Sequence, residues 1–271
     1  MNKIADKKIG FIGAGKMGGA IIKGVLDSGF LTKENIVISE NSEHTAKIAS
    51  EILGLPVDTD NNALVRNSDI IFLCTKPFVL RDVISGIKTE LTGDKLLVSI
   101  AAGISTETIE SAAGVEIPVI RVMPNTPALV GEGMTAVCKG KYADSEHINL
   151  VMDIFSQIGR CVEVPEKLID AVTGISGSGP AFFYLMIEAM ADGGVKLGIP
   201  KATALELAAQ TALGAAKMIL ETGKHPSVLK DEVTTPGGCT AAGLSVMEEQ
   251  KIRAGLIRTV EETARVAKGL G

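Results

Sequence analysis

Short apolar runs of four or five residues alternate with helix-forming stretches throughout the first 164 residues. The runs are apolar along their length rather than at every second position, which is typical of strands buried on both faces of a parallel sheet. A strand–helix repeat of this kind predicts βαβ units and an α/β, doubly wound sheet. The predicted strands are 9–12, 36–39, 70–74, 96–100 and 119–123, and the predicted helices are 17–29, 43–53, 61–67, 78–90 and 105–113. Runs 134–139 and 161–164 predict two further strands at an edge of the sheet.

The pattern of apolar residues changes after Pro165. Strand-like runs give way to long stretches rich in helix formers, with an apolar periodicity of about 3.6 residues. These stretches are 181–195, 201–222 and 244–268. The sequence therefore predicts two domains, a sheet domain at 1–164 and an all-helical domain at 165–271.

The composition excludes several classes of protein. Hydrophobic residues make up 46% of the 271 residues, but aromatic residues only 3% and Trp is absent, so the core must be aliphatic. A net charge of −5 argues against nucleic acid as a main partner. No apolar stretch reaches about 18 residues and residues 1–8 lack an apolar signal core, so we expect no membrane span and a cytoplasmic location. The four cysteines form no C-x-x-C pair, which favours buried reduced thiols over disulfides.

A glycine motif stands between the first predicted strand and the first predicted helix. Gly13 permits a tight turn, Gly15 lets the backbone approach a pyrophosphate, and Gly18 lets the helix pack on the strand. The helix N-terminus adds free N–H groups and the positive end of its dipole. A tight strand–helix turn without a ligand is the alternative. The residues expected to bind a dinucleotide here are Gly13, Ala14, Gly15, Lys16, Met17 and Gly18.

Further cofactor contacts are expected outside the carboxyl ends of the other strands, where ligands of such sheets bind. Glu40 has the place of the carboxylate that bonds a ribose 2′-hydroxyl and favours NAD, although a solvated loop carboxylate is the alternative. Ser39 and its polar neighbours suit a 2′-phosphate, so the cofactor is NADPH or NADH. Lys76 either bonds the nicotinamide ribose or is an ordinary surface lysine. The remaining candidates at these strand ends are Thr75, Pro77, Ala101, Ala102, Gly103 and Asn125.

Two glycine-rich segments, 174–180 and 233–240, interrupt the helical half, each just ahead of a predicted helix. Their N–H and hydroxyl groups can form a nest for an anion, and Pro180 suits the first turn of a helix. Capped turns between helices are the alternative. The pair of segments indicates a small anionic substrate.

Ordinary acid–base groups are missing from these motifs. None of the three histidines lies in a motif, and no metal-ligand spacing is present. A carbonyl reductase normally needs a proton donor, whereas a cyclic imine can arrive already protonated, and hydride addition to an iminium creates no oxyanion. The sequence therefore favours reduction of C=N over C=O, and it leaves the identity of any general acid open.

Taken together, these motifs closely resemble the pyrroline-5-carboxylate reductases along essentially the whole chain. The resemblance rests on residues 11–18, 76–77, 99–103, 123–127, 176–180, 188–194 and 235–240, of which the later blocks are specific to that family. It implies an N-terminal Rossmann domain and a C-terminal helical dimerisation domain, hence a homodimer or higher homo-oligomer. It also implies hydride transfer from NAD(P)H to the C=N of 1-pyrroline-5-carboxylate, a cyclic imine carboxylate, giving L-proline.

The same resemblance assigns roles to individual residues. It implies that Asn61 and Lys76 touch the cofactor. It implies that Glu166, Cys239 and Thr240 lie at the substrate ring and carboxylate, with Thr240 as the catalytic residue. The full expected substrate set is Glu166, Ser176, Gly177, Ser178, Gly179, Gly237, Gly238, Cys239 and Thr240. Many members of the family have no acidic residue where this chain has Glu40, so the choice between NADPH and NADH stays open.

Two other classes fit parts of the sequence. A β-hydroxyacid dehydrogenase shares the two-domain plan, but it carries a catalytic Lys and Asn on the first helix of its second domain, and residues 180–192 contain neither. A non-enzymatic NAD(P)-sensing or scaffold protein would not need the two substrate segments, which are intact here.

Overall fold

The computed structural model describes Ile4 and residues 6–269, so the outer limits of both predicted domains and part of the N-terminal segment lie outside the described residues. The described chain forms two compact units. One comprises the residues up to Ser178 together with those from Glu262 onward, and the other is Gly179–Glu261. The predicted boundary at 164/165 falls at the end of the last strand, inside the first unit, and as a division between functional domains it stays a prediction.

The first unit is built on a seven-stranded sheet with the order β2-β1-β3-β4-β5-β6-β7. Only β6 runs antiparallel to its β5 neighbour, and all other pairs are parallel. The strands are β1 (Ile9–Ile12), β2 (Ile36–Ser39), β3 (Ile70–Leu73), β4 (Leu96–Ser99), β5 (Val119–Met123), β6 (Gly133–Lys139) and β7 (Gly159–Glu163). The predicted doubly wound sheet is confirmed, and so are its five parallel strands. The chain passes from β1 to β2 on one side and returns to β3 on the other, so the switch point lies between β1 and β3.

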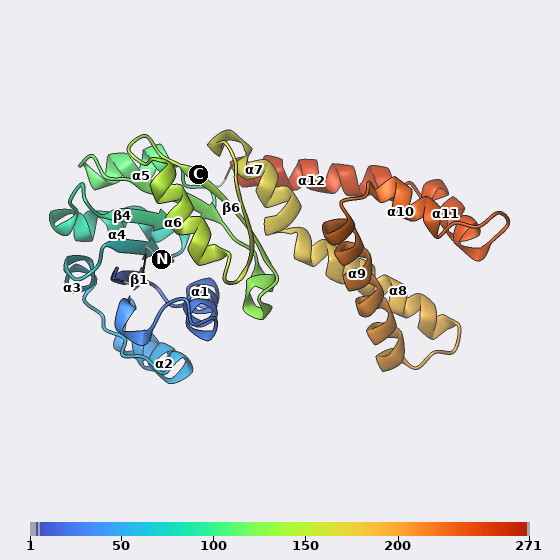
Figure 1. Ribbon diagram of the computed structural model, residues 1–271, viewed down its shortest axis with the longest axis horizontal. Coiled ribbons are helices and arrows are strands. Elements are labelled where there is room, and N and C mark those ends of the chain that lie inside the picture. The colour runs from blue at the N-terminus through green and yellow to red at the C-terminus, as the bar shows by residue number, and fades with distance from the viewer. Residues whose placement is uncertain (1–3, 5, 270–271) are drawn as a thin grey trace. The chain divides into compact units, whose positions relative to one another are not determined.

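Helices cover both faces of this sheet (Figure 1). They are α1 (Lys16–Asp27), α2 (Glu43–Leu53), α3 (Asn61–Arg66), α4 (Leu80–Ile87), α5 (Thr106–Ala113), α6 (Ser145–Phe155) and the short α7 (Ile169–Val172). The first five correspond to the predicted helices, whereas α6 was not predicted. The predicted helix 78–90 is α4 with one 3₁₀ turn before it and another after it.

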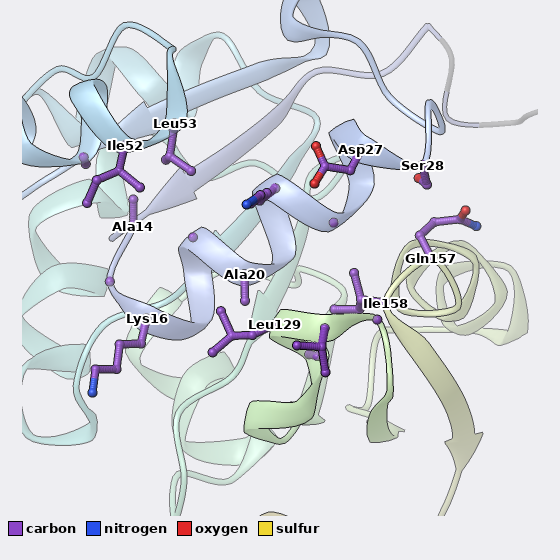
Figure 2. A pocket seen from close by; sticks show the side chains of 18 of the residues that line it. Ala14, Lys16, Ala20, Asp27, Ser28, Ile52, Leu53, Leu129, Gln157 and Ile158 are labelled. Carbon is purple, nitrogen blue, oxygen red and sulfur yellow. The ribbon is translucent and has the colours of Figure 1, made fainter. Parts of the chain in front are cut away.

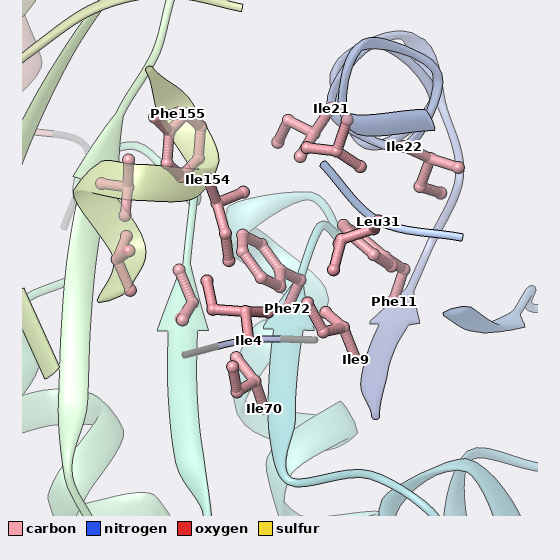
Figure 3. Packing of buried hydrophobic residues seen from close by; sticks show 14 of the residues in the cluster. Ile4, Ile9, Phe11, Ile21, Ile22, Leu31, Ile70, Phe72, Ile154 and Phe155 are labelled. Atoms are coloured by element: carbon pink, nitrogen blue, oxygen red, sulfur yellow. The ribbon is translucent and has the colours of Figure 1, made fainter. Parts of the chain in front are cut away.

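Alternate residues of each central strand pack into two different apolar clusters. Ile70 and Phe72 face α1 and α6, whereas Ile71 and Leu73 face α3, α4 and α5. Burial on both sides is therefore the reason why these strands are apolar at consecutive positions. In the first cluster the ring of Phe11 stacks on Phe72, with centroids 4.7 Å apart (Figure 3).

The second unit contains α8 (Gly179–Lys196), α9 (Lys201–Thr222), α10 (Pro226–Glu232), α11 (Cys239–Glu249) and α12 (Ile252–Lys268) as far as Glu261. The helices α8 and α9 pack closely, because a Cβ on Gly194 would lie 3.2 Å from the Cβ of Ala204. The single helix predicted at 244–268 is wrong. The chain breaks into α11 and α12 at Lys251, whose φ of 56° is left-handed and cannot continue a helix.

The segment 174–180 also differs from the expected open loop. Residues Thr173–Gly177 form a π-helical turn that leads through Ser178 directly into α8. The N–H of Ser178 donates to the carbonyl of Thr173, so the segment is helical rather than an open loop, and its role in binding an anion stays a prediction. Within the described residues, no helix is both long enough and apolar enough to cross a membrane.

Candidate functional site

The glycine turn lies at the switch point of the sheet, between the ends of β1 and β3. Gly13 has a φ of 96°, which only glycine adopts without strain, and a Cβ there would lie 3.0 Å from the carbonyl oxygen of Cys74. Gly18, on the first turn of α1, is buried, and its Cβ would lie 2.5 Å from the carbonyl oxygen of Gly13. Gly13 is therefore required by its positive φ and by the close approach of the chain after β3, and Gly18 is required by the close approach of α1 to the turn.

Gly15 is different, because apart from its own and adjacent backbone nothing in the described chain lies within 4 Å of where its Cβ would stand. It caps α1 in an extended conformation and makes no side-chain capping bond. The first N–H groups of a helix have no partner inside the helix, so those of α1 are available to an anion at this place. The open space over Gly15 is the cradle that a pyrophosphate needs.

Glu40 follows β2 and reaches back to the glycine turn. The N–H of Ala14 donates a hydrogen bond to Oε1 of Glu40 at 2.6 Å. Next to it, the buried hydroxyl of Ser39 donates to Oδ1 of Asn61, the first residue of α3, at 2.7 Å. The structure therefore gathers Ser39, Glu40 and Asn61 at the end of β2, where an adenosine ribose lies in proteins of this fold.

The ends of β3 and β4 supply the other predicted cofactor positions. The hydroxyl of Thr75 is buried and has no hydrogen-bond partner within the described residues, so it is available to a ligand. Lys76 is exposed, and Pro77 begins a 3₁₀ turn directly after it. After β4, Ala101 is buried, while Ala102 and Gly103 are half-buried. These residues leave room and one unpaired hydroxyl along the carboxyl edge, and they fit a dinucleotide.

A cavity of about 910 Å³ opens at one end onto Ala14, Gly15, Lys16 and Glu40. Figure 2 shows Ala14 and Lys16 at the start of α1, with Asp27 and Ser28 at its far end. Most of the cavity runs along α1 between apolar side chains such as Ile52 and Leu129. Only its mouth at the glycine turn coincides with the predicted cofactor site, because dinucleotides follow the carboxyl edge of the sheet rather than the flank of the first helix.

Two of the predicted cofactor residues, Met17 and Asn125, are engaged within the protein, Met17 by packing and Asn125 by hydrogen bonds. Met17 packs against the apolar core beneath the turn, and Lys16 is the exposed first residue of α1. Asn125 is 8% exposed, and both ends of its amide are engaged: Nδ2 donates to the carbonyl of Ser176 at 3.0 Å, and Oδ1 accepts from the N–H of Met134 at 2.8 Å. The structure thus places Asn125 beside the predicted substrate segment, where its amide links Ser176 to Met134.

Glu166, a predicted substrate residue, is already bound by protein groups. Its Oε1 accepts hydrogen bonds from the N–H of Thr106 at 2.8 Å and from Arg121 at 3.2 Å. Its Oε2 accepts from the Thr106 hydroxyl at 2.7 Å. Sequence reasoning missed Arg121, although a charged residue inside a buried apolar strand was a signal for it.

The remaining predicted substrate residues fall into two groups. Ser176, Gly177 and Ser178 end the first unit, and Gly179 begins the second. The others lie together in the second unit at the start of α11, where Gly238 is the N-cap. Thr240 is the second residue of that helix and half-buried, so it is not the cap. The residues at the start of α11 are Gly237, Gly238, Cys239 and Thr240.

No histidine of the described chain lies in these motifs, and of its cysteines only Cys239 is a predicted site residue. His147 bonds Asp144 at the start of α6, and Nδ1 of His225 caps α10. Burial, reinforced by the Glu40 charge, raises the pKa of the Cys74 thiol far above its usual range, so this group beneath the turn stays protonated and unreactive. No group of three or more metal-ligating side chains occurs among the described residues.

A parallel sheet, a glycine turn at its switch point and an acceptor carboxylate after the second strand define a dinucleotide-binding protein of the Rossmann class. Comparison with known proteins narrows this class. Residues 166–270 match the family model described as pyrroline-5-carboxylate reductase dimerisation. Residues 8–103 match the model described as NADP oxidoreductase coenzyme F420-dependent.

Relatives extend this match over the whole chain. The pyrroline-5-carboxylate reductase of Methanosarcina acetivorans is 49% identical over 98% of both chains. The structure is similar to that of the Coxiella burnetii pyrroline-5-carboxylate reductase, with a TM-score of 0.91, 33% identity and 98% of each chain covered. It is also similar to the Plasmodium falciparum pyrroline carboxylate reductase with NADP bound, with a TM-score of 0.88, 35% identity and the same coverage. The chain belongs to the pyrroline-5-carboxylate reductase family.

Proposed function

We propose that this protein reduces 1-pyrroline-5-carboxylate to L-proline with NAD(P)H, the last step of proline biosynthesis. The observation that carries the proposal is the 49% identity to a pyrroline-5-carboxylate reductase over nearly the full length of both chains. The glycine turn, the open space over Gly15 and the unpaired Thr75 hydroxyl support it from the structure.

The reaction transfers one hydride and one proton. Bound NAD(P)H supplies the hydride, which adds to the carbon of the ring C=N while the cofactor becomes NAD(P)⁺. The electrons of the C=N π bond move to nitrogen, and a proton on that nitrogen completes the secondary amine. Because a protonated imine needs no further acid, the enzyme must chiefly hold the ring and exclude water.

Thr240 is our candidate for the residue that meets the imine nitrogen. Its hydroxyl stands on the first turn of α11, where the N–H groups that follow Gly238 favour a negative charge. We propose that these N–H groups bind the substrate carboxylate and that the Thr240 hydroxyl bonds the ring nitrogen. Holding both groups would fix which face of the ring accepts the hydride.

Glu40 favours NADH as the natural reductant. Its carboxylate already turns toward the glycine turn, since it accepts the Ala14 N–H. In that place it would accept a hydrogen bond from a ribose 2′-hydroxyl and repel a 2′-phosphate. The Plasmodium falciparum structure holds NADP, so this preference would distinguish the present chain from that relative.

We further propose a homodimer or larger homo-oligomer. The buried apolar residues of the described second unit are three alanines, Ala191, Ala204 and Ala208. Large apolar side chains on the same helices stay exposed, including Phe183 at 56% and Leu185 at 66%. Exposed apolar surface on this scale marks an interface, and a second copy is the partner that the matched dimerisation model supports. The cytoplasmic location and the lack of a nucleic-acid partner stay predictions.

A turnover assay tests the proposed reaction. The purified protein is mixed with 1-pyrroline-5-carboxylate and either NADH or NADPH, and the loss of reduced cofactor is followed together with the appearance of proline. We expect one proline for each cofactor oxidised, and no turnover with a β-hydroxyacid and the oxidised cofactor. A cofactor-binding protein that leaves the imine unchanged under these conditions would refute the proposal.

A further inference from the structure

A short strap, residues 166–178, runs along one face of the sheet beside β5 and ends at the loop after that strand. Ile169 packs against Cys138 of β6 beneath it. Farther along the strap, a Cβ on Gly177 would lie 2.6 Å from Cε of Met123, the last residue of β5. The strap therefore brings its last turn to the carboxyl end of β5, on the edge where the cofactor is expected.

A network of charged side chains holds the first part of the strap. Arg121, in the middle of β5, lies 3.2 Å from Oε1 of Glu166 and 3.8 Å from Oδ1 of Asp170. Its side chain is only 7% exposed, so these pairs are screened less by water than pairs at the surface. The two bonds from Thr106 to Glu166 complete the network.

A second contact holds the far end of the strap. Asn125 donates to the carbonyl of Ser176 and accepts from the N–H of Met134, so it ties the strap to the start of β6. The strap is thus fixed to the sheet at both ends, by Arg121 on β5 and by Asn125 just after it.

We propose that Arg121 and Glu166 are positioning residues for hydride transfer, an inference that rests on the proposed reductase activity. Thr106 begins α5 only three residues after Gly103. The loop Ala101–Ala102–Gly103 is the segment predicted beside the nicotinamide. The Glu166 carboxylate therefore fixes two segments at once: the loop that would face the cofactor and the strap that carries Ser176–Ser178.

The chemistry of the pair explains why a small change should matter. Both carboxylate oxygens of Glu166 accept hydrogen bonds, three in all. A glutamine in its place has only one oxygen that can accept them. Glu166→Gln directs an NH₂ group at one of these donors and removes the charge that Arg121 faces. Because hydride transfer is steep in distance, a displacement of about 1 Å can lower the rate by about a hundredfold.

The test compares Glu166→Gln with Glu90→Gln. Glu90 also pairs with an arginine, Arg66, at 2.8 Å, and its side chain is 27% exposed against 29% for Glu166. It lies in the 3₁₀ turn that follows α4 and is not a predicted site residue, so it controls for the loss of an ion pair. For each variant we would measure kcat, KM for the imine, cofactor Kd, the melting temperature, and the isotope effect on kcat with cofactor deuterated at nicotinamide C4.

We expect Glu166→Gln to lower kcat at least about tenfold and to raise the isotope effect, with cofactor Kd within about threefold of the wild type. Arg121→Lys should reproduce this pattern, because lysine cannot reach both carboxylates as the guanidinium does. Glu90→Gln should keep wild-type kinetics.

Two results would overturn the proposal. In one, Glu166→Gln keeps the wild-type kcat and isotope effect. In the other, it raises only the KM for the imine while Arg121→Lys behaves as wild type, which would make Glu166 a direct substrate contact. If Glu166→Gln does not fold, Thr106→Val decides: it removes one hydroxyl from the network, and an unchanged kcat and isotope effect would equally overturn the proposal. A wild-type protein without imine turnover would instead refute the proposed function.

Discussion

Replacing Gly15 with valine should abolish tight cofactor binding and leave the fold nearly intact. The cost to the fold is small because, apart from the backbone next to Gly15 itself, no atom of the described chain lies within 4 Å of the new Cβ, and the φ of −63° is negative, so the residue needs no left-handed conformation. Losing glycine at an N-cap costs up to about 1 kcal/mol, and the stiffer unfolded chain returns about 0.4–1 kcal/mol. We therefore expect the melting temperature to fall by no more than about 4 °C.

The cost to cofactor binding is larger, since the new side chain fills the space over the N–H groups of α1. Losing one hydrogen bond from these groups to a charged pyrophosphate costs about 1.5–3 kcal/mol. The Kd for NADH or NADPH should therefore rise roughly ten- to a hundredfold. Because the chain has no Trp, the fluorescence of the reduced cofactor itself is a clean signal for the titration.

Gly18→Ala is the matched control for this reasoning. Its Cβ would lie 2.5 Å from the carbonyl oxygen of Gly13, so the helix must move and the fold itself should lose about 1–3 kcal/mol. The two variants should thus differ in what they lose: Gly15→Val should lose cofactor affinity, and Gly18→Ala should lose stability. A folded Gly15→Val protein that binds cofactor within about threefold of the wild type would show that the pyrophosphate does not lie over Gly15.

Four further outcomes follow from the same geometry. Glu40→Ser should shift the ratio of kcat/KM values toward NADPH by about tenfold, and an unchanged ratio would mean that the carboxylate does not meet the ribose. Thr240→Ala should lower kcat/KM for the imine at least about tenfold with little change in melting temperature, because Gly238 and not Thr240 caps α11; loss of stability with normal kinetics would contradict this role. Burial, with a smaller contribution from Glu166, raises the pKa of the Cys138 thiol from 9.0 to about 12, so above about pH 9 the unfolded chain releases a proton that the folded chain keeps. Stability should therefore fall as pH rises, and between pH 8 and 10 the wild type should lose about 1 kcal/mol more than Cys138→Ala in urea titrations; parallel losses would show that this thiol does not stay protonated. Dilution to micromolar concentration should leave a dimer or larger assembly in sedimentation experiments, and a fully active monomer would refute the assembly.

The parts of the fold that sequence predicts well are those with local causes. Gly13 is needed by its own φ of 96° and Gly18 by a backbone contact within the same turn, and the strands are apolar because both of their faces are buried. Each of these signals lies within a few residues of the structure that it specifies. The break at Lys251 has no such signal, because neither glycine nor proline stands there, although its φ of 56° is left-handed.

In the candidate site, too, only the features with local causes could be predicted from the sequence. Its glycine turn and the carboxylate after β2 follow from strand ends that can be located in the sequence. The partners of Glu166 cannot be located in this way, since Arg121 and Thr106 lie 45 and 60 residues away from it. The sheet register pairs Arg121 with Ser99 of β4 and with Cys138 of β6, and Ile169 of the strap packs against Cys138.

The second unit shows why helices can be predicted while their partner cannot. Its helices pack through small residues: Gly194 approaches Ala204, and the buried apolar residues are alanines. Small residues bring two helix backbones together, but they bury little apolar area. Larger side chains of these helices, such as Leu205 at 45% and Leu213 at 55% exposed, are left on the outside. The spacing of these apolar residues lets the helices be predicted from the sequence, because the periodicity is the same whichever surface covers them. Burying each such side chain would contribute about 1.5–3 kcal/mol that the chain on its own does not gain. The surface that covers them must therefore be identified from a structure of the assembly.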